Sequence, residues 1–172
     1  ILVGRKFRFS HRELIELGLG CFLHDIGKVV VDQLAESQDK SRARDLYREH
    51  PTFGYLMLKN NADVSPIETQ IVNQHHEAQD GSGFPIGLTG QNQPPVKTVV
   101  RESKGQIFRL AEVCCVADAF DKLSCNPNDH ETKDPAEAAR QLILDAGVMY
   151  NKEIVQTLLK VVPFYPVGAS IS

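Results

Sequence analysis

An apolar stripe that ends in ionisable side chains is the feature of this sequence that most restricts its fold. Between residues 11 and 28, Leu14, Leu17 and Cys21 stand at the spacings of three and four that mark one face of a helix. The same face continues into the sequence HDIGK, residues 24–28. Burying a charge without a partner is very costly, so the groups that end this stripe must be paired or must hold a metal ion.

Two further predicted helices show the same pattern. In residues 66–76 the stripe ends in the adjacent histidines His75 and His76. In residues 106–123 it ends in Asp118, within the apolar run VCCVADAF. Imidazole and carboxylate are the ligands that borderline divalent metals prefer. Because three apolar stripes end in such groups, a shared metal site is favoured over a separate structural role for each group.

Each of these groups taken alone also has a structural explanation. Asp25 can pair with Lys28, and Asp118 can cap a turn or pair with Arg109 or Lys122. A single histidine at the end of an apolar stripe is more often a satisfied residue at the boundary of the core. The metal hypothesis therefore rests on the conjunction of these residues.

The set of donors is larger than one tetrahedral zinc ion would use. A carboxylate such as that of Asp25 can bridge two ions, and a pair of ions can activate a water for attack on phosphorus. Lys28, one helical turn from His24, can hold a phosphate as a point charge. Because neighbours on a helix lie about 100° apart, His75 and His76 can reach one ion each. The candidate ligands are His24, Asp25, His50, His75, His76 and Asp118.

Helical periodicity almost throughout the chain predicts an all-α fold, with residues 1–172 as a single domain. Ser65 and Glu68 have the spacing of a capping box, and Asn151 can cap the last helix. Residues 80–95 are rich in glycine and proline and predict a loop. The tail FYPVGASIS is β-prone but short. The predicted helices span 11–28, 42–59 with a break before Pro51, 66–76, 106–123, 134–147 and 151–162.

Charge and cysteine usage exclude several classes of protein. The net charge of -3 gives no basic surface for nucleic acid or an anionic membrane. No apolar run is long enough to span a bilayer, and no signal peptide is recognisable, so membrane insertion is not expected. The four cysteines form no regular framework and suit a reducing, cytoplasmic compartment, where they act as small apolar residues in helices.

The motifs also resemble a known family when they are taken in order. HDIGK, EHPTFGYLML, HHEAQDGSGFPIGLTG and RLAEVCCVADAFDKL follow one another in the order and spacing of HD-GYP domains. These domains are a branch of the HD-domain metal-dependent phosphohydrolases. The resemblance runs from about residue 10 to YPVG at 165–168. It implies an HD-domain helical bundle with a short β-prone C-terminal tail.

The resemblance also implies an activity, which is cleavage of the bacterial second messenger cyclic di-GMP on a bi- or trinuclear metal centre. The six candidate ligands match the ligand positions of the family, Asp25 matches a catalytic position, and Lys28 matches the lysine that contacts phosphate. A donor set of this kind suits iron or manganese, with nickel or zinc as alternatives. The signature loop that is expected to bind substrate consists of Asp80, Gly81, Gly83, Phe84 and Pro85.

Three departures from the family pattern keep other functions open. Phe84 replaces the signature tyrosine and lacks its hydroxyl, and residues 124–133 lack the arginine of a basic stretch that grips phosphates. The chain also starts too close to His24 for a ligand from an upstream helix, so that helix is expected to be missing or truncated. The alternatives are a catalytically weak signalling module that contacts partner proteins, and a phosphohydrolase for another nucleotide.

Overall fold

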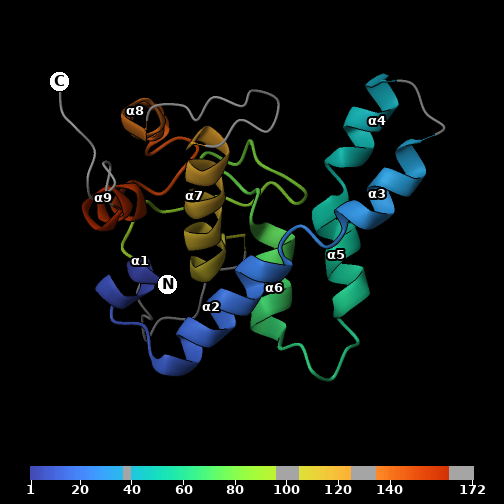
Figure 1. The fold of residues 1–172 in the computed structure, drawn as a ribbon, viewed down its shortest axis with the longest axis horizontal. Coiled ribbons are helices and arrows are strands. Elements are labelled where there is room, and N and C mark those ends of the chain that lie inside the picture. Colours follow the sequence, from blue (N-terminus) through green and yellow to red (C-terminus); the bar gives the residue numbers. More distant parts are fainter. Residues whose placement is uncertain (37–39, 96–104, 125–134, 163–172) are drawn as a thin grey trace, which may run out of the picture.

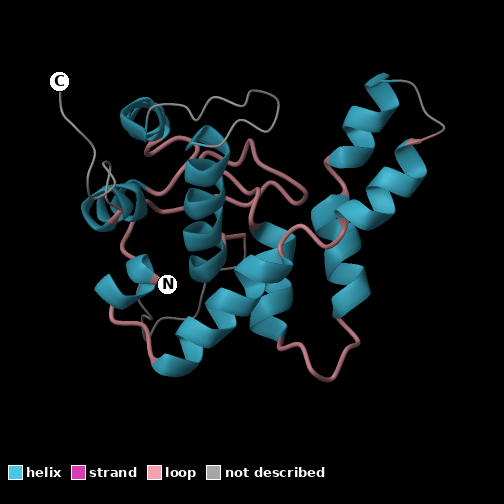
Figure 2. Cartoon of the chain, viewed as in Figure 1, coloured by secondary structure: helices cyan, strands magenta, loops and turns pink. Residues whose placement is uncertain are grey.

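The computed structural model describes residues 1–36, 40–95, 105–124 and 135–162. Within these ranges the chain is helical and has no strand, which confirms the all-α fold (Figure 2). Two isolated β-bridges occur outside the helices. The helices are α1 (Leu2–Lys6), α2 (His11–Leu23), α3 (Lys28–Ala35), α4 (Lys40–Tyr47), α5 (His50–Leu58), α6 (Pro66–Gln74), α7 (Arg109–Ser124), α8 (Pro135–Asp145) and α9 (Lys152–Val161).

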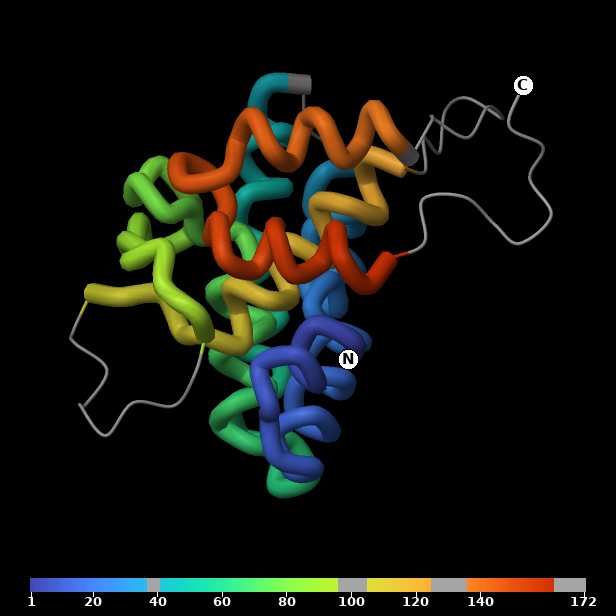
Figure 3. Tube along the Cα trace, turned by 90° about the vertical axis from the view of Figure 1, so that its left-hand side faces the viewer, coloured from blue at the N-terminus to red at the C-terminus, as the bar shows by residue number. Residues whose placement is uncertain are grey.

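The helices pack around α6 and α7, which contact each other at the centre of the bundle. α2 and α5 pack on α6, while α8 and α9 pack on α7, and α3 with α4 forms the opposite end of the molecule (Figure 1). In the perpendicular view α8 and α9 run one above the other across α7 (Figure 3). The core they enclose is built from fully buried residues of five helices, namely Leu17, Ile71, Leu110, Leu142 and Ile154.

Local capping signals determine where several helices begin. The Ser65 hydroxyl accepts from the Glu68 N–H, and the Glu68 carboxylate accepts from the Ser65 N–H, so the predicted capping box is confirmed. Asn151 caps α9 as predicted by accepting from two N–H groups of its first turn. The break before Pro51 is confirmed too, since α5 has Pro51 in its first turn.

The predicted helix over 11–28 is confirmed up to Leu23 and is wrong after that residue. α2 ends at Leu23, and α3 begins at Lys28, so Lys28 does not lie one helical turn from His24. Gly27 lies against the start of α5, where a Cβ would stand 2.0 Å from the carbonyl oxygen of His50. Only a glycine allows this close approach, and the chain turns there instead of continuing as a helix.

Other differences are smaller. α1 was not expected, and α6 ends at Gln74 instead of about His76. Cys21, Cys114 and Cys115 are free thiols in helices, as expected, whereas Cys125, Asp134 and the β-prone tail lie outside the described residues. In the described ranges, no helix combines the length and the apolar character that crossing a bilayer demands.

Candidate metal centre

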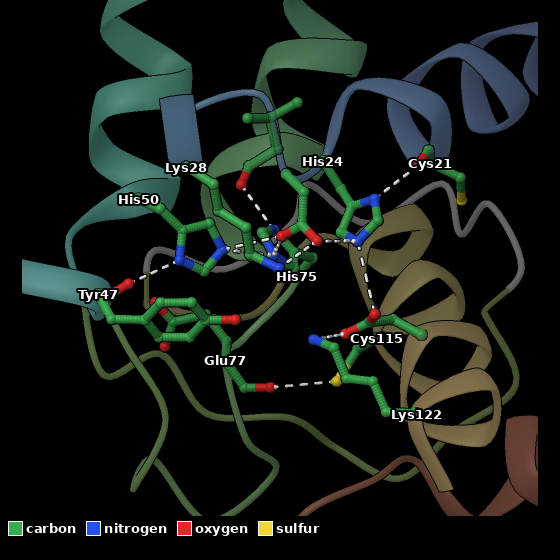
Figure 4. A network of polar contacts seen from close by, with 12 residues as sticks. Cys21, His24, Lys28, Tyr47, His50, His75, Glu77, Cys115 and Lys122 are labelled. Atoms are coloured by element: carbon green, nitrogen blue, oxygen red, sulfur yellow. Dashed lines mark hydrogen bonds and ion pairs between the residues drawn. The ribbon is translucent and has the colours of Figure 1, made fainter. Parts of the chain in front are cut away.

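Helix ends and one helix interior place the candidate ligands around a single point. His24 is the C-cap of α2, Asp25 lies in the turn that follows, and His50 opens α5. His75 is the C-cap of α6, with His76 directly after it, and Asp118 lies in α7. In Figure 4 the imidazoles of His24, His50 and His75 point toward one another beside the Lys28 side chain.

Hydrogen bonds fix which ring nitrogen each of three histidines presents. His24, His50 and His75 each place Nδ1 against the carbonyl oxygen three residues earlier, at 2.7, 2.7 and 2.8 Å. A carbonyl can only accept, so each Nδ1 carries the proton and donates. Metal-binding histidines commonly use their second nitrogen in this way. Each Nε2 therefore faces the centre, and it carries a lone pair wherever the ring is neutral.

Lone pairs then face one another across the site. The Nε2 atoms of His50 and His75 are 3.2 Å apart, and both rings are fully buried. Asp25 Oδ1 lies 3.2 Å from His50 Nε2 and 3.8 Å from His75 Nε2. Donor atoms about 2.1 Å from one shared ion stand about 3.0–3.4 Å from one another. The three acceptor atoms therefore have about the spacing of ligands around a cation. No hydrogen-bond donor of the described residues lies between them to explain their close approach.

A second group of donors lies on the other oxygen of Asp25. Asp25 Oδ2 is 3.2 Å from His24 Nε2, and that nitrogen is 3.4 Å from Asp118 Oδ1. The donor atoms of Asp25, His50, His75 and His76 lie within 4.8 Å of one another and could hold a metal ion. Asp25 thus belongs to two donor groups, one on each carboxylate oxygen.

Buried atoms without partners support the fit of these residues to metal ions. Within the described residues, Asp25 Oδ1, His24 Nε2 and His76 Nε2 are buried and have no hydrogen-bond partner. Buried polar atoms are normally satisfied, so orphaned atoms that converge on one point indicate a ligand. Imidazole nitrogen and carboxylate oxygen together suit iron, manganese, nickel or zinc.

The electrostatics of the site keep two imidazoles neutral. Burial, helped by the neighbouring His24, lowers the pKa of His75 to about 3. Burial, with a smaller electrostatic contribution from the neighbouring His75, lowers the pKa of His76 to about 2. A neutral imidazole is the form that binds a metal, so both residues are ready to act as ligands at neutral pH.

His24 has the opposite environment. Burial alone would lower its pKa, but the carboxylates of Asp118 and Asp25 outweigh burial and raise it to about 10. In return, burial would raise the pKa of Asp118, but His24 and Lys122 bring it down to about 2. The negative charge of Asp25 and Asp118 favours a positive charge on His24. The same negative charge would also favour a metal cation at this position.

The ion pairs that offered a structural explanation are present as well. Lys28 pairs with Asp25 Oδ2 at 2.5 Å, and Lys122 pairs with Asp118 Oδ2 at 2.5 Å. Arg109 instead pairs with Glu13. The two lysine pairs each use one carboxylate oxygen and leave the facing imidazole nitrogens of His50 and His75 without a donor. The pairs are therefore compatible with a metal site and do not replace it.

The signature loop covers one side of this centre. The Phe84 ring stacks on the His76 ring with centroids 4.7 Å apart, and the Phe84 N–H donates to the His76 carbonyl at 3.1 Å. A Cβ on Gly83 would stand 2.3 Å from the Ala78 nitrogen, so glycine is required where the loop crosses the chain after His76. Phe84 and Pro85 are joined by a cis peptide bond.

Asp80 and Gly81 shape the loop more than they approach the ligands. Asp80 is exposed, and its carboxylate accepts from the N–H and the hydroxyl of Ser82 at 2.9 and 2.7 Å. Gly81 has φ +83°, a conformation that favours glycine. The role of these two residues and of Pro85 in substrate binding stays a prediction.

Sequence reasoning missed the buried carboxylate that anchors the loop. Glu77 accepts from the N–H groups of Ile86 and Leu88 at 2.8 and 2.7 Å. It directly follows His75 and His76 and precedes a glycine-rich segment, and this position was the available signal. His75 and His76 themselves fall in the same donor group, so their assignment to separate ions stays a prediction.

Comparison with known proteins identifies the family. A sequence model described as HD domain matches residues 2–97, more than half of the chain. The chain belongs to the HD-domain family, whose phosphohydrolases are metal-dependent. The resemblance to HD-GYP domains is confirmed by the relatives that the chain matches.

Two relatives carry a named activity. The chain is 29% identical over 174 residues to a cyclic di-GMP phosphodiesterase of Pseudomonas aeruginosa. The aligned region covers 99% of this chain and 38% of that protein. It is 27% identical over 162 residues to a cyclic di-GMP phosphodiesterase of Thermotoga maritima, with 92% of this chain and 40% of that protein covered. The chain thus spans well under half the length of either relative.

A solved structure shares the fold. The structure of a protein described as HDG"Y"P, from Bdellovibrio bacteriovorus, matches 93% of this chain and 47% of its own length with a TM-score of 0.67. The sequence identity is 22%. This likeness supports the helical-bundle architecture.

Proposed function

We propose that this chain is the catalytic part of a metal-dependent phosphodiesterase that hydrolyses a cyclic dinucleotide, with cyclic di-GMP as the first candidate. The observation that carries the proposal is the set of histidine Nε2 atoms that face both oxygens of Asp25. The named activity of the two relatives supports the choice of substrate.

The two donor groups suggest how the ions are held. Asp25 Oδ1, His50, His75 and His76 would bind one ion, and Asp25 Oδ2, His24 and Asp118 would bind a second. This arrangement differs from the prediction that His75 and His76 reach one ion each. We propose iron or manganese, which accept this mixture of nitrogen and oxygen ligands. The ions would supply Lewis-acid polarisation of the phosphodiester and activation of a water molecule.

Side chains of the protein orient and neutralise the reacting groups. The helix ends hold each imidazole through its Nδ1, so the ligand positions are fixed before substrate arrives. The Lys28 ammonium lies beside Asp25 and 5.3 Å from the centre of the Tyr47 ring. From that position it can contact a phosphate oxygen and stabilise the negative charge that develops in the transition state.

The proposal is tested by reconstituting the purified protein with ferrous iron or manganese and following cyclic di-GMP by chromatography. We expect linear or fully hydrolysed products, whose formation a chelator stops and added metal restores. If the metal-loaded protein hydrolyses another cyclic dinucleotide instead, the proposed reaction holds and only the proposed substrate is wrong. Loaded protein that hydrolyses no cyclic dinucleotide would contradict the proposal and favour a signalling module that acts through protein contacts.

A further inference from the structure

An arginine lies at the edge of the candidate centre without an ionic partner. Arg48 sits in the turn between α4 and α5, and its guanidinium carbon lies 4.7 Å from the centroid of the Phe84 ring. The side chain is exposed. In the part of the chain that the structure describes, no carboxylate pairs with its guanidinium, which carries five N–H donors.

The other cations around the centre are already engaged. Lys28 pairs with Asp25, and Lys122 pairs with Asp118. Each of these lysines already has part of its charge neutralised by a carboxylate. Arg48 can bind an anion without giving up an ion pair.

The position of Arg48 follows from its contact with the signature loop. The ring beneath its guanidinium, Phe84, stacks on His76 and lies 6.4 Å from the ring of His50, measured between centroids. Phe84 is therefore a platform that touches a candidate metal ligand and also carries the arginine. An anion bound to Arg48 would therefore lie next to the signature loop, which covers one side of the centre.

We propose that Arg48 binds a phosphate group of the ligand at the rim of the metal centre, with Phe84 as the ring that orients its guanidinium. The inference rests on the proposed function in taking a phosphodiester as the ligand, and it assigns a specificity-determining residue to the reaction. It also supplies a basic contact for a chain whose residues 124–133 contain no arginine.

The chemistry of the guanidinium suits this role. Its planar fork can donate two parallel hydrogen bonds to one phosphate, and stacking on an aromatic ring fixes its orientation before the anion arrives. Lysine shares the charge but has neither the fork nor the flat face. Arg48→Lys is therefore expected to retain only part of the affinity, whereas Arg48→Ala removes all of the contact.

The test measures calorimetric binding of inorganic phosphate to the metal-loaded protein at constant ionic strength. Arg48→Ala is expected to weaken phosphate binding by about tenfold or more, and Arg48→Lys by about threefold, with metal content unchanged. Arg140→Ala removes an equal charge from an exposed position on α8, at the far side of the molecule in Figure 1, and is expected to bind phosphate as the wild type does. Arg48→Gln provides a second neutral variant if Arg48→Ala unfolds.

The outcomes separate this inference from the proposed function. Equal phosphate affinity in Arg48→Ala and wild type, an equal loss in Arg140→Ala, or no phosphate binding by the loaded wild type would overturn the role of Arg48. Loss of phosphate affinity in Arg48→Ala, together with a wild type that cleaves no cyclic dinucleotide, would contradict the proposed function and leave the phosphate site in place. If the role of Arg48 and the proposed function are both correct, the KM for cyclic di-GMP rises in Arg48→Ala by a larger factor than kcat falls.

Discussion

Two buried polar clusters of this molecule look alike in composition and differ in how their atoms face. The first is the candidate metal centre around Asp25. The second is a network around Glu112, which lies under the loop of residues 80–95. Both place carboxylates among helices, with Glu112 buried and Asp25 half-buried.

In the Glu112 network every contact joins a donor to an acceptor. Glu112 Oε1 accepts from Gln79 Nε2 at 2.7 Å and from Asn151 Nδ2 at 3.2 Å. Gln79 Oε1 accepts from the Asn92 N–H at 3.0 Å. Burial raises the pKa of Glu112 despite the hydrogen bonds from Gln79 and Asn151, which oppose it. This cluster joins α7, the loop and α9.

At the metal centre the facing atoms are acceptors on both sides. His50 Nε2, His75 Nε2 and Asp25 Oδ1 have no donor among them, because each Nδ1 proton is used by a carbonyl. Complementary contacts indicate a structural role, whereas converging acceptors indicate a site for a cation. The comparison predicts that substitutions in the two clusters have different consequences.

The largest effect is expected for His75→Ala. Removing one ligand should reduce the bound metal by at least one equivalent and abolish hydrolysis, since a metal site depends on the number and geometry of its ligands. Elemental analysis and turnover of the same sample check this. His11→Ala is the matched control, because His11 is exposed at the start of α2. Full metal content and activity in His75→Ala would show that His75 is not a ligand.

Glu112→Leu should instead damage stability. It would leave the buried Gln79 amide without an acceptor, while Asn151 Nδ2 keeps its hydrogen bond to the Gln93 carbonyl. The expected cost is about 2–4 kcal/mol in the free energy of unfolding. Urea denaturation measures this loss. Glu112→Gln retains an acceptor oxygen and should cost less than half as much. Metal per folded molecule should stay at the wild-type value in both variants. A loss of metal from folded Glu112→Gln would contradict a purely structural role for the Glu112 network.

Glu13→Gln tests a paired carboxylate that belongs to neither cluster. Burial would raise the pKa of Glu13, but the Ser10 N–H, the Arg109 guanidinium and the Ser10 hydroxyl bring it from 4.5 down to about 2. Because the folded pKa is depressed, its stabilisation is present above pH 4.5 and is lost as the pH falls toward 2.

The variant should therefore be less stable than wild type by about 1 kcal/mol at pH 7, and the difference should shrink steadily below pH 4.5. Urea denaturation at a series of pH values measures it. Asp32→Asn, at an exposed position of α3, should show no such trend. A difference for Glu13→Gln that is the same at pH 7 and pH 3 would disprove the assigned pairing.

The smallest effect is expected for Phe84→Tyr, which restores the hydroxyl of the family signature. The ring can keep its stack on His76, so metal content should not change. One added hydrogen bond to the ligand would change KM by less than about tenfold. Steady-state kinetics and elemental analysis check both statements. A loss of metal in this variant would mean that the ring packing at His76 is tighter than the stacking geometry implies.

The sequence predicted those parts of the structure that depend on local signals. The capping box of Ser65 and Glu68, the Asn151 cap and the break before Pro51 are set by neighbours along the chain, and all three are confirmed. The end of α2 depends on the contact of Gly27 with α5, which is distant in sequence, and the predicted helix was too long for that reason.

The same distinction applies to the candidate site. The stripes that end in His24, His75 and Asp118 pointed to the residues that the structure brings together. The stack of Arg48 on Phe84 joins a turn to a loop from another part of the chain, and no periodicity encodes it. The facing of Nε2 atoms likewise depends on the three-dimensional arrangement of helix ends.

The most direct test of the account is the metal stoichiometry of the folded protein after reconstitution with iron or manganese under reducing conditions. Two donor groups that share Asp25 predict at least two equivalents in the wild type, and one fewer in Asp118→Ala, which removes a ligand from only one group. A folded wild type that retains no metal after reconstitution would contradict the claim that these converging acceptors form a metal centre.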